Sequence, residues 1–356
     1  MTDQPTTRCL PPRIAAFLAV ALLLALTHLP ALGWAEEAPL AADLVQDGQT
    51  IDLDQAKYRS LFAELTQKHQ FSAAQLQAIF QGQRINQKVL VLMDKQWEAK
   101  PYYRYAPMFV TPENIRDGKE QLQRHKALLD RIEASFGVNR EVVVAIWGVE
   151  TRYGTRQGAY DVLQTLNTLF DAYPRRSDFF RKQLIDFLLL CRESGRDPHG
   201  VMGSYAAAFG QTQFIPSSYR EYAVSFDGDA KRDVWDSVPD VLASIANYLK
   251  RCKWTLGAPV YRDIGFTLND PLLAAAEEKG RKERVSLDLV RKAQQLDLPL
   301  SPQNRPVTIV GLELEPGGPY AKRYVAGYPN FQAVTEWNHS NRYAMAVAEL
   351  AEALTR

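Results

Sequence analysis

One glutamate in the sequence stands where its chemistry should be unusual. Glu150 ends the run Val142 to Val149, which is apolar on nearly every face and therefore predicts a buried helix. Burial disfavours the carboxylate, and so does the negative end of the helix dipole, so we expect a raised pKa. A carboxylic acid that stays protonated near neutral pH can act as a general acid. The alternative is a structural glutamate that only bonds Arg152 or a backbone amide.

A second stretch, from Gly203 to Tyr219, combines small residues with neutral hydrogen-bonding side chains. Its glycines allow other groups to come close to the backbone. Ser204, Gln213 and Tyr219 carry hydroxyl and amide groups, which suit ligands that themselves present amides and hydroxyls. The alternative is a tightly packed helical hairpin that binds nothing.

A third stretch, residues 225–236, resembles an EF-hand calcium loop. The expected oxygen donors are Ser225, Asp227, Asp229, the carbonyl of Lys231, and Asp236. The stretch departs from the pattern in its first ligand, its missing central glycine and its short last acid, and Lys231 and Arg232 would repel a cation. The alternative is an acidic surface turn that caps the following helix.

Helices must position these residues, because capping signals and helical periodicity dominate from about residue 45. The expected helices are a short one after a capping box at Ser72, Ile115 to Phe136 after a cap at Thr111, one after Asn139 that stops at Gly154, Ser177 to Glu193, Pro239 to Cys252, and Ser340 to Leu354. After Gly257 short segments appear, including the strand-like Val307 to Leu312. We therefore predict a mainly α (α+β) protein with an α-rich region at 36–256, a small α/β insertion at 257–331 and a C-terminal segment at 332–356 that closes the core.

Composition narrows the class of protein. The 356 residues are 46% hydrophobic and 23% charged, so the chain has enough apolar material for a sizeable core. Its 42 basic and 41 acidic residues leave a net charge of +1. Such a chain has no general positive field for nucleic acid, so we expect no nucleic-acid partner.

The first 35 residues are typical of a secretory signal peptide. Arginines precede an apolar run from Ile14 to Leu26, and small residues follow it up to Ala35. The alternative is an uncleaved anchor helix, for which the run is short. No cysteine follows the run to carry a lipid. Cys191 and Cys252 would remain in the exported chain, and their spacing leaves open whether they form a disulfide or stay as buried thiols.

Four sequence blocks together resemble the family of membrane-bound lytic transglycosylase B. They are 150–154 (Glu-Thr-Arg-Tyr-Gly), 173–176 (Tyr-Pro-Arg-Arg), 203–219 and 338–347. They come in the family's order and extend over most of the chain after about residue 50. The resemblance implies a lysozyme-like catalytic core, an elongated α-rich body and cleavage of peptidoglycan between N-acetylmuramic acid and N-acetylglucosamine. It also implies a degenerate EF-hand at 225–236 that could hold a structural calcium ion, and no cofactor for catalysis.

The resemblance also implies roles for individual residues. Glu150 matches the catalytic acid/base. The positions that match sugar-contacting residues are Tyr105, Ser204, Gln213, Tyr248, Asn338 and Tyr343. Arg175 and Arg176 match a pair that could meet a lactyl or peptide carboxylate, unless they are merely solvated. Trp337 stands where the family pattern has tyrosine, so sugar stacking survives there but a hydroxyl contact is in doubt.

These expectations define one function and two rivals. Ordinary glycosidases use two carboxylates, and the sequence around Glu150 offers no obvious second acid. We therefore predict a non-hydrolytic lytic transglycosylase of the periplasm that acts as a monomer on glycan strands, with cell-wall synthesis proteins as candidate partners. The rivals are a hydrolytic muramidase on the same fold and a non-catalytic peptidoglycan-binding protein.

Overall fold

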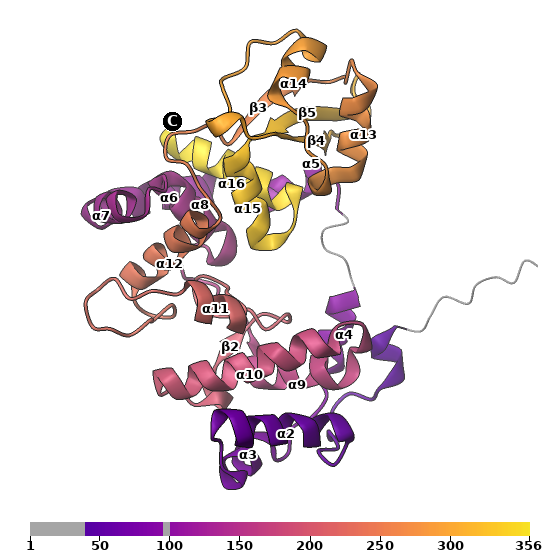
Figure 1. Cartoon of the computed structure of the whole chain (residues 1–356), viewed down its shortest axis with the longest axis vertical. Coiled ribbons are helices and arrows are strands. Elements are labelled where there is room, and N and C mark those ends of the chain that lie inside the picture. Colours follow the sequence, from indigo (N-terminus) through magenta and orange to yellow (C-terminus); the bar gives the residue numbers. More distant parts are fainter. Residues whose placement is uncertain (1–39, 95–99) are drawn as a thin grey trace, which may run out of the picture. The chain divides into compact units, whose positions relative to one another are not determined.

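The structure is a computed structural model that describes residues 40–94 and 100–356 (Figure 1). The contacts within the chain divide it into two units, Met1–Pro39 and Leu40–Arg356, and all described residues belong to the second. The predicted signal peptide, residues 1–35, lies outside the described residues. In the part that is described, none of the helices is long and apolar enough to cross a membrane.

Helices make up most of the described chain. The α-helices up to residue 151 are α2 (Ala56–His69), α3 (Ala73–Phe80), α4 (Gln87–Asp94), α5 (Tyr102–Tyr105), α6 (Pro112–Arg124), α7 (Lys126–Phe136) and α8 (Arg140–Thr151). Those that follow are α9 (Val162–Ala172), α10 (Ser177–Ser194), α11 (Pro216–Tyr222), α12 (Val238–Arg251), α13 (Pro271–Lys279), α14 (Leu287–Gln294), α15 (Pro329–Asn338) and α16 (Asn341–Thr355). Short 3-10 helices are η1 (Ala41–Leu44), η3 (Ala106–Met108), η4 (Pro174–Arg176), η5 (Pro198–Gly200), η6 (Gly280–Lys282) and η7 (Pro302–Asn304).

The capping signals in the sequence act as expected at two helix starts. Ser72 forms a reciprocal capping box with Gln75 at the start of α3, and the Thr111 side chain accepts from the Asn114 N–H at the start of α6. The single helix predicted from Ile115 to Phe136 is wrong, because His125 leaves the helical conformation (φ −104°, ψ 20°) and separates α6 from α7. The His125 ring packs against Trp147 with 6.2 Å between centroids, a tertiary contact that sequence periodicity does not reveal.

Helix α8 lies at the centre of the larger hydrophobic core. Every residue from Val142 to Val149 is buried, and α6, α7, α12 and α16 pack around the helix. Each fully buried valine or isoleucine there stabilises the fold by about 1.5–3 kcal/mol relative to exposure. Because α8 is apolar on all sides, other helices pack against it on all sides. This packing fixes the position of Glu150 in the last turn of the helix.

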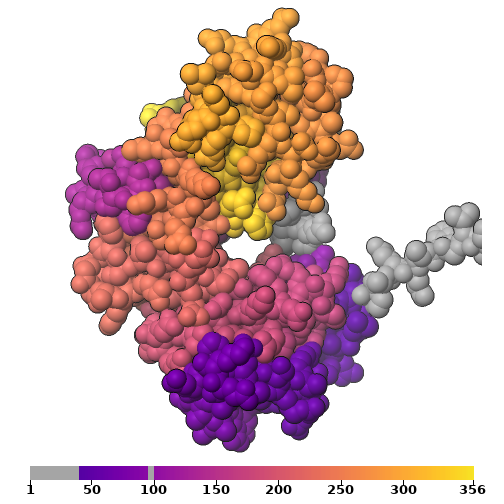
Figure 2. Space-filling model, in the orientation of Figure 1, coloured from indigo at the N-terminus to yellow at the C-terminus, as the bar shows by residue number. Residues whose placement is uncertain are grey.

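Residues 257–331, predicted from the sequence to be an insertion, contain a small antiparallel sheet. Its strands are β3 (Tyr261–Gly265), β4 (Thr308–Glu313) and β5 (Lys322–Gly327), in the order β3-β5-β4. Successive residues of β4 point to opposite faces: Ile309 joins a second hydrophobic cluster with α13 and α14, while Val310 joins the main core. Because both faces are buried, the strand is apolar without strict alternation. Figure 2 shows the surface of the insertion in orange beside the C-terminal helices in yellow, in keeping with the contact between β5 and α15.

A second sheet pairs β1 (Tyr160–Asp161) with β2 (Met202–Gly203). Two residues per strand suffice to bring the start of α9 beside the stretch that begins at Gly203. That glycine is required by close approach, because a Cβ there would lie 2.3 Å from the Ala208 carbonyl oxygen. The observed architecture, mainly α with small sheets, confirms the predicted fold class.

Candidate active site

Glu150 occupies the last turn of α8, where two neutral side chains hold its carboxyl group. The Tyr343 hydroxyl donates to Oε1 at 2.6 Å, and the Trp337 indole N–H also hydrogen-bonds the side chain. Burial raises the pKa of Glu150 to about 7, and these two hydrogen bonds oppose the rise because they favour the charged form. The residue keeps some exposed surface, so a ligand can reach an acid that is half protonated near neutral pH.

The turn after Glu150 explains the Glu-Thr-Arg-Tyr-Gly block. Arg152, Tyr153 and Gly154 all have positive φ (48°, 58° and 86°), so the chain turns sharply at the helix end. The Tyr153 ring folds back onto Gly148, where a Cβ would lie 2.6 Å from the Tyr153 hydroxyl oxygen. The Tyr153 hydroxyl donates to the Asn114 carbonyl at 2.7 Å. The block therefore locks the end of α8 to α6.

Aromatic rings form a connected group beside the carboxyl. The Trp337 ring centroid lies 4.6 Å from that of Tyr248 and 5.1 Å from that of Phe214, and Tyr222 lies 4.5 Å from Tyr248. Trp337 is partly exposed, whereas Tyr248 is buried and its hydroxyl donates to the Glu336 carbonyl at 2.7 Å. Such rings suit the apolar faces of sugars.

Tyr105 reaches this region from α5. It is buried, packs on Phe109 with centroids 5.1 Å apart, and lies close enough to Tyr343 to act on its ionisation. The helix is anchored through Tyr102, whose backbone N–H donates to Glu313 at 3.0 Å and whose hydroxyl donates to Glu349 at 2.6 Å. The insertion, through Glu313, therefore helps to place Tyr105.

Among the described residues, the hydrogen bonds of Ser204 lie within the second motif, and those of Gln213 join that motif to Gln157, so neither side chain bonds Glu150. The Ser204 hydroxyl accepts from the N–H groups of Ala206 and Ala208 at 3.3 and 3.1 Å. Gln213 has a positive φ of 50°, and its amide donates to the carbonyls of Gln157 and Gly210 at 3.1 and 2.9 Å. From Gly203 to Ile215 the stretch is a series of tight turns and short β-bridges, and helix α11 begins at Pro216, so the stretch is not a helical hairpin.

The arginine pair is exposed. Arg175 forms an ion pair of 3.0 Å with Asp94, whose side chain is only 3% exposed. The Arg176 guanidinium lies over the Phe179 ring at 4.2 Å. Both arginines already have partners within the protein, which would compete with a ligand carboxylate.

Asn338 is exposed and lines a polar pocket of about 510 Å³. The pocket is lined on the insertion side by Glu277, Arg281 and Glu313, and next to Asn338 by His339. His339 has a left-handed φ of 51° and ends α15.

Of the predicted site residues, Trp337 and Tyr343 contact Glu150 directly. Tyr248 packs on Trp337, and Tyr105 lies near Tyr343.

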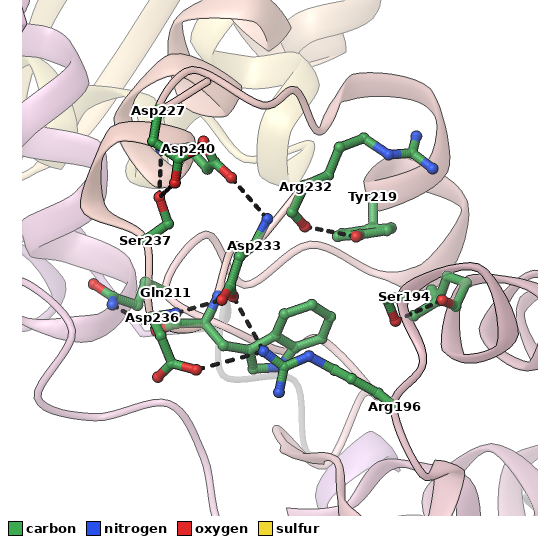
Figure 3. Close-up of polar contacts among 12 residues, drawn as sticks. Ser194, Arg196, Gln211, Tyr219, Asp227, Arg232, Asp233, Asp236, Ser237 and Asp240 are labelled. Carbon is green, nitrogen blue, oxygen red and sulfur yellow. Dashed lines mark hydrogen bonds and ion pairs between the residues drawn. The ribbon is translucent and has the colours of Figure 1, made fainter. Parts of the chain in front are cut away.

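The acidic loop forms a cluster that differs from the predicted ligand set. Carboxylate oxygens of Asp227, Asp229 and Asp240 all lie within 4.8 Å of one another. Asp236, the predicted last ligand, is instead 79% exposed and pairs with Arg196 at 3.4 Å (Figure 3). The physical reason is that Asp240 comes from the first turn of α12, where a buried carboxylate also accepts the N–H groups of the loop.

Sequence reasoning missed two features of the structure, the carboxylate of Asp240 in the acidic cluster and the contact of Trp337 with Glu150. Asp240 could have been found, because Ser237 and Asp240 have the spacing of a capping box before an apolar helix. The hydrogen bond from Trp337 to Glu150 had no sequence signal. Cys191 and Cys252 are free thiols, the first buried and the second half-buried, so they form no disulfide.

A partly buried acid beside neutral hydrogen-bond donors and aromatic rings suits acid–base chemistry on a sugar polymer. The comparisons with known proteins agree. Residues 54–352 match the family model described as Transglycosylase SLT domain, and the chain belongs to that family. It is a peptidoglycan lytic transglycosylase with a lysozyme-like fold.

Three relatives illustrate the similarity. Membrane-bound lytic murein transglycosylase B of Escherichia coli (strain K12) is 36% identical over 301 residues, which cover 82% of this chain and 80% of the relative. Soluble lytic transglycosylase SltB1 from Pseudomonas aeruginosa is 36% identical, with a TM-score of 0.75 over 83% of this chain and 97% of that chain. The Escherichia coli lytic transglycosylase Slt35 in complex with calcium is 33% identical, with a TM-score of 0.74 over 88% and 96%.

Proposed function

We propose that this enzyme cleaves the β-1,4 bond between N-acetylmuramic acid and N-acetylglucosamine without water and leaves 1,6-anhydromuramic ends. The observation that supports this route is the single carboxyl of Glu150, whose side-chain partners, Tyr343 and Trp337, are both neutral. Among the described residues, no second acid hydrogen-bonds Glu150, which supports a route in which this one carboxyl serves first as acid and then as base.

The reaction begins with neutral Glu150. Its proton passes to the glycosidic oxygen, the bond between that oxygen and C1 of the muramoyl ring breaks, and N-acetylglucosamine leaves with a free hydroxyl. Positive charge develops on the muramoyl ring and is stabilised by neighbouring dipoles and by the negative charge of ionised Glu150.

The second half returns the proton. Ionised Glu150 removes the proton from the muramoyl 6-hydroxyl, whose oxygen attacks C1 and closes the anhydro ring. Glu150 is protonated again and no water is consumed. Tyr343 and Trp337 support the first half, because their hydrogen bonds favour the ionised carboxylate that remains when Glu150 has given up its proton.

The remaining residues have proposed roles along the glycan. Tyr105, Tyr248 and Trp337 provide aromatic surface, and Ser204, Gln213 and Asn338 provide neutral polar groups. Arg175 and Arg176 lie on an exposed turn where a guanidinium could meet a stem-peptide or lactyl carboxylate.

We further propose that the acidic cluster binds a structural calcium ion. Its three carboxylates are hard oxygen donors, as calcium requires, and Ser225 and the Lys231 carbonyl remain predicted additional ligands. Slt35, whose structure is a complex with calcium, is a relative over most of its length. A bound cation would neutralise the repulsion within the cluster and fix the loop before α12.

Export places the enzyme where its substrate is. The predicted signal peptide at 1–35 would deliver the chain to the periplasm, and we propose that it acts there as a monomer on glycan strands, alongside cell-wall synthesis proteins.

Mass spectrometry of muropeptides released from purified cell-wall sacculi tests the reaction. The proposal predicts anhydro products, each lighter by one water molecule than the corresponding reducing-end product, whereas a muramidase used as a control gives reducing ends. Reducing ends from this protein would establish the hydrolytic rival, and binding without release would establish the non-catalytic one.

A further inference from the structure

Gln211 joins the catalytic helix to the acidic loop, and its acceptors face the helix. Its side chain is only 8% exposed. The side-chain Oε1 accepts from Trp147 Nε1–H at 2.9 Å, and the backbone carbonyl accepts from the Thr151 hydroxyl at 3.2 Å. Trp147 lies one turn before Glu150 and Thr151 directly follows it, so Gln211 holds α8 on both sides of the catalytic residue.

The two donors of Gln211 face the loop. Its side-chain Nε2 donates to the Trp235 carbonyl at 2.6 Å, and its backbone N–H donates to the Val234 carbonyl at 2.7 Å. All four polar groups of this buried residue are therefore satisfied, two by the loop and two by α8. Loss of the side chain would leave buried polar groups unpaired in both elements.

Gly154 makes room for this side chain. The residue has a φ of +86°, and a Cβ at this position would lie 2.4 Å from Gln211 Oε1. The last glycine of the Glu-Thr-Arg-Tyr-Gly block is thus needed for the glutamine of the second motif to reach Trp147. Two motifs far apart in the sequence dock on each other through Gln211.

The connection continues to the acidic cluster. The Asp233 carboxylate accepts from the Trp235 N–H at 2.9 Å, and the Asp233 N–H donates to Asp240 at 2.8 Å. Figure 3 shows Asp233 of the loop together with Gln211 and Asp240, which come from the segments before and after it. A continuous series of hydrogen-bonded residues runs from Asp240 through Asp233, Trp235 and Gln211 to α8.

We propose that Gln211 is a positioning residue, which keeps Glu150 in its water-poor surroundings by fixing α8 to the loop at 225–236. The proposal rests on the proposed function, because it concerns the same catalytic carboxyl. Gln211 does not act on the substrate itself; its effect passes through Trp147 and Thr151 to the residue between them.

Gln211→Met tests the proposal, because methionine has a similar length but neither hydrogen-bonding group. We expect kcat to fall about 10- to 100-fold, since a displacement of about 1 Å at a catalytic group has an effect of this size. The alkaline limb of the pH profile should move to lower pH, because water that reaches Glu150 lowers its pKa. A purely structural role would lower the Tm and move neither quantity.

Gln183→Met is the matched control. Gln183 lies on α10, is 4% exposed and accepts from the Ser217 N–H at 3.0 Å, so its loss also removes a buried amide hydrogen bond. This variant should lose Tm but keep the wild-type kcat and pH profile at a temperature well below its Tm.

Trp147→Phe gives a second route if Gln211→Met does not fold. It removes the indole N–H from which Gln211 accepts a hydrogen bond, together with part of the ring surface that packs on His125 and Tyr153, and it should reproduce the loss of kcat and the shifted alkaline limb. Wild-type kcat and pH profile in the folded variants would overturn the proposal while leaving the proposed function intact. No turnover by the wild-type protein would overturn the proposed function, and this proposal with it.

Discussion

Glu150 and the acidic cluster of Asp227, Asp229 and Asp240 place the same functional group among different neighbours, although burial raises the pKa of both Glu150 and Asp240. Glu150 stands alone, its partners are the neutral groups of Tyr343 and Trp337, and burial raises its pKa to about 7. In the cluster, three carboxylates converge within 4.8 Å. The Ser237 hydroxyl and the Asp229 N–H lower the pKa of Asp227, so that this carboxyl stays charged.

The difference shows that the burial of a carboxyl group and the charges of its neighbours together determine whether it exchanges a proton or attracts a cation. A lone, partly dry carboxyl exchanges a proton near neutral pH, which is what an acid that must also act as a base requires. Several ionised carboxylates that repel one another gain most from a cation. The first site should therefore respond to pH and the second to calcium.

The largest effect should come from removing the proton at the first site. Glu150→Gln keeps the shape of the side chain but can neither donate nor accept a catalytic proton. We expect turnover of sacculi to fall by about 10³-fold or more, with glycan binding retained. Muropeptide release and a sacculus-binding assay measure the two, and turnover near the wild-type level would remove Glu150 from its assigned role.

The same variant has a stability signature that shows it is folded. Because the pKa of Glu150 is raised on folding, its protonated form stabilises the fold below about pH 4.5, and that contribution is lost as the pH rises to about 7. Glu150→Gln avoids the loss, so its free energy of unfolding should exceed that of the wild type by about 3 kcal/mol at pH 8. The difference should vanish at pH 4, as denaturant unfolding at both pH values would show.

The next effect concerns the hydrogen bond to Glu150. Tyr343→Phe removes a bond that favours the ionised carboxylate, so the pKa of Glu150 should rise and the alkaline limb of the pH profile should move to higher pH. We expect kcat to fall about tenfold, as for the loss of a hydrogen bond to a charged group. Tyr328→Phe is the control, because Tyr328 is equally buried but bonds the Pro299 carbonyl. Identical pH profiles for both variants would contradict this role of Tyr343.

A smaller effect, the rise in Tm on adding calcium, should distinguish the observed acidic cluster from the predicted set of calcium ligands. Millimolar calcium chloride should raise the Tm of the wild type by about 5 °C, because a ligand that binds only the folded state stabilises it. Asp240→Asn should lose most of that increment, while Asp236→Asn should keep it, since Asp236 pairs with Arg196. The calcium-dependent increment is compared, not the Tm itself, because Asp240 also holds the loop backbone. Loss of the increment in the Asp236 variant alone would favour the EF-hand spacing.

The smallest effects should come from the exposed arginines. Arg175 is engaged by Asp94, so Arg175→Ala should raise KM less than about threefold. Arg176→Ala should raise KM slightly more, by about two- to fivefold. The Arg176 guanidinium packs on neutral aromatic rings, whereas the charge of Arg175 is already paired with a carboxylate, so Arg176 has more charge to offer a ligand. Kinetics with peptide-bearing glycan measure both, and a rise of tenfold or more for Arg175→Ala would show that the substrate displaces Asp94.

The part of this structure that could be predicted is the part governed by local patterns. An apolar helix that ends in an acid identified Glu150 and the direction of its pKa shift, and capping signals located α3 and the start of α6. These features follow from residues a few positions apart. The fold class followed from the same periodicities and from the resemblance in four blocks.

What could not be predicted depends on residues distant in the sequence. Trp337 hydrogen-bonds Glu150 although the two residues lie 187 positions apart in the sequence, and no spacing rule connects them. The break at His125 reflects its packing on Trp147. Asp240 replaces Asp236 in the cluster because α12 turns its first carboxylate inward, which depends on how that helix packs.

The pKa of Glu150 is the quantity that tests this account most directly. Carboxyl carbon NMR of glutamate-labelled protein, with Glu150→Gln to assign the signal, follows the titration of that one side chain. The account predicts a midpoint of about 7 for Glu150. A midpoint near 4.5, the ordinary value for glutamic acid, would mean that the carboxyl is fully hydrated and charged at neutral pH and could not be the proton donor.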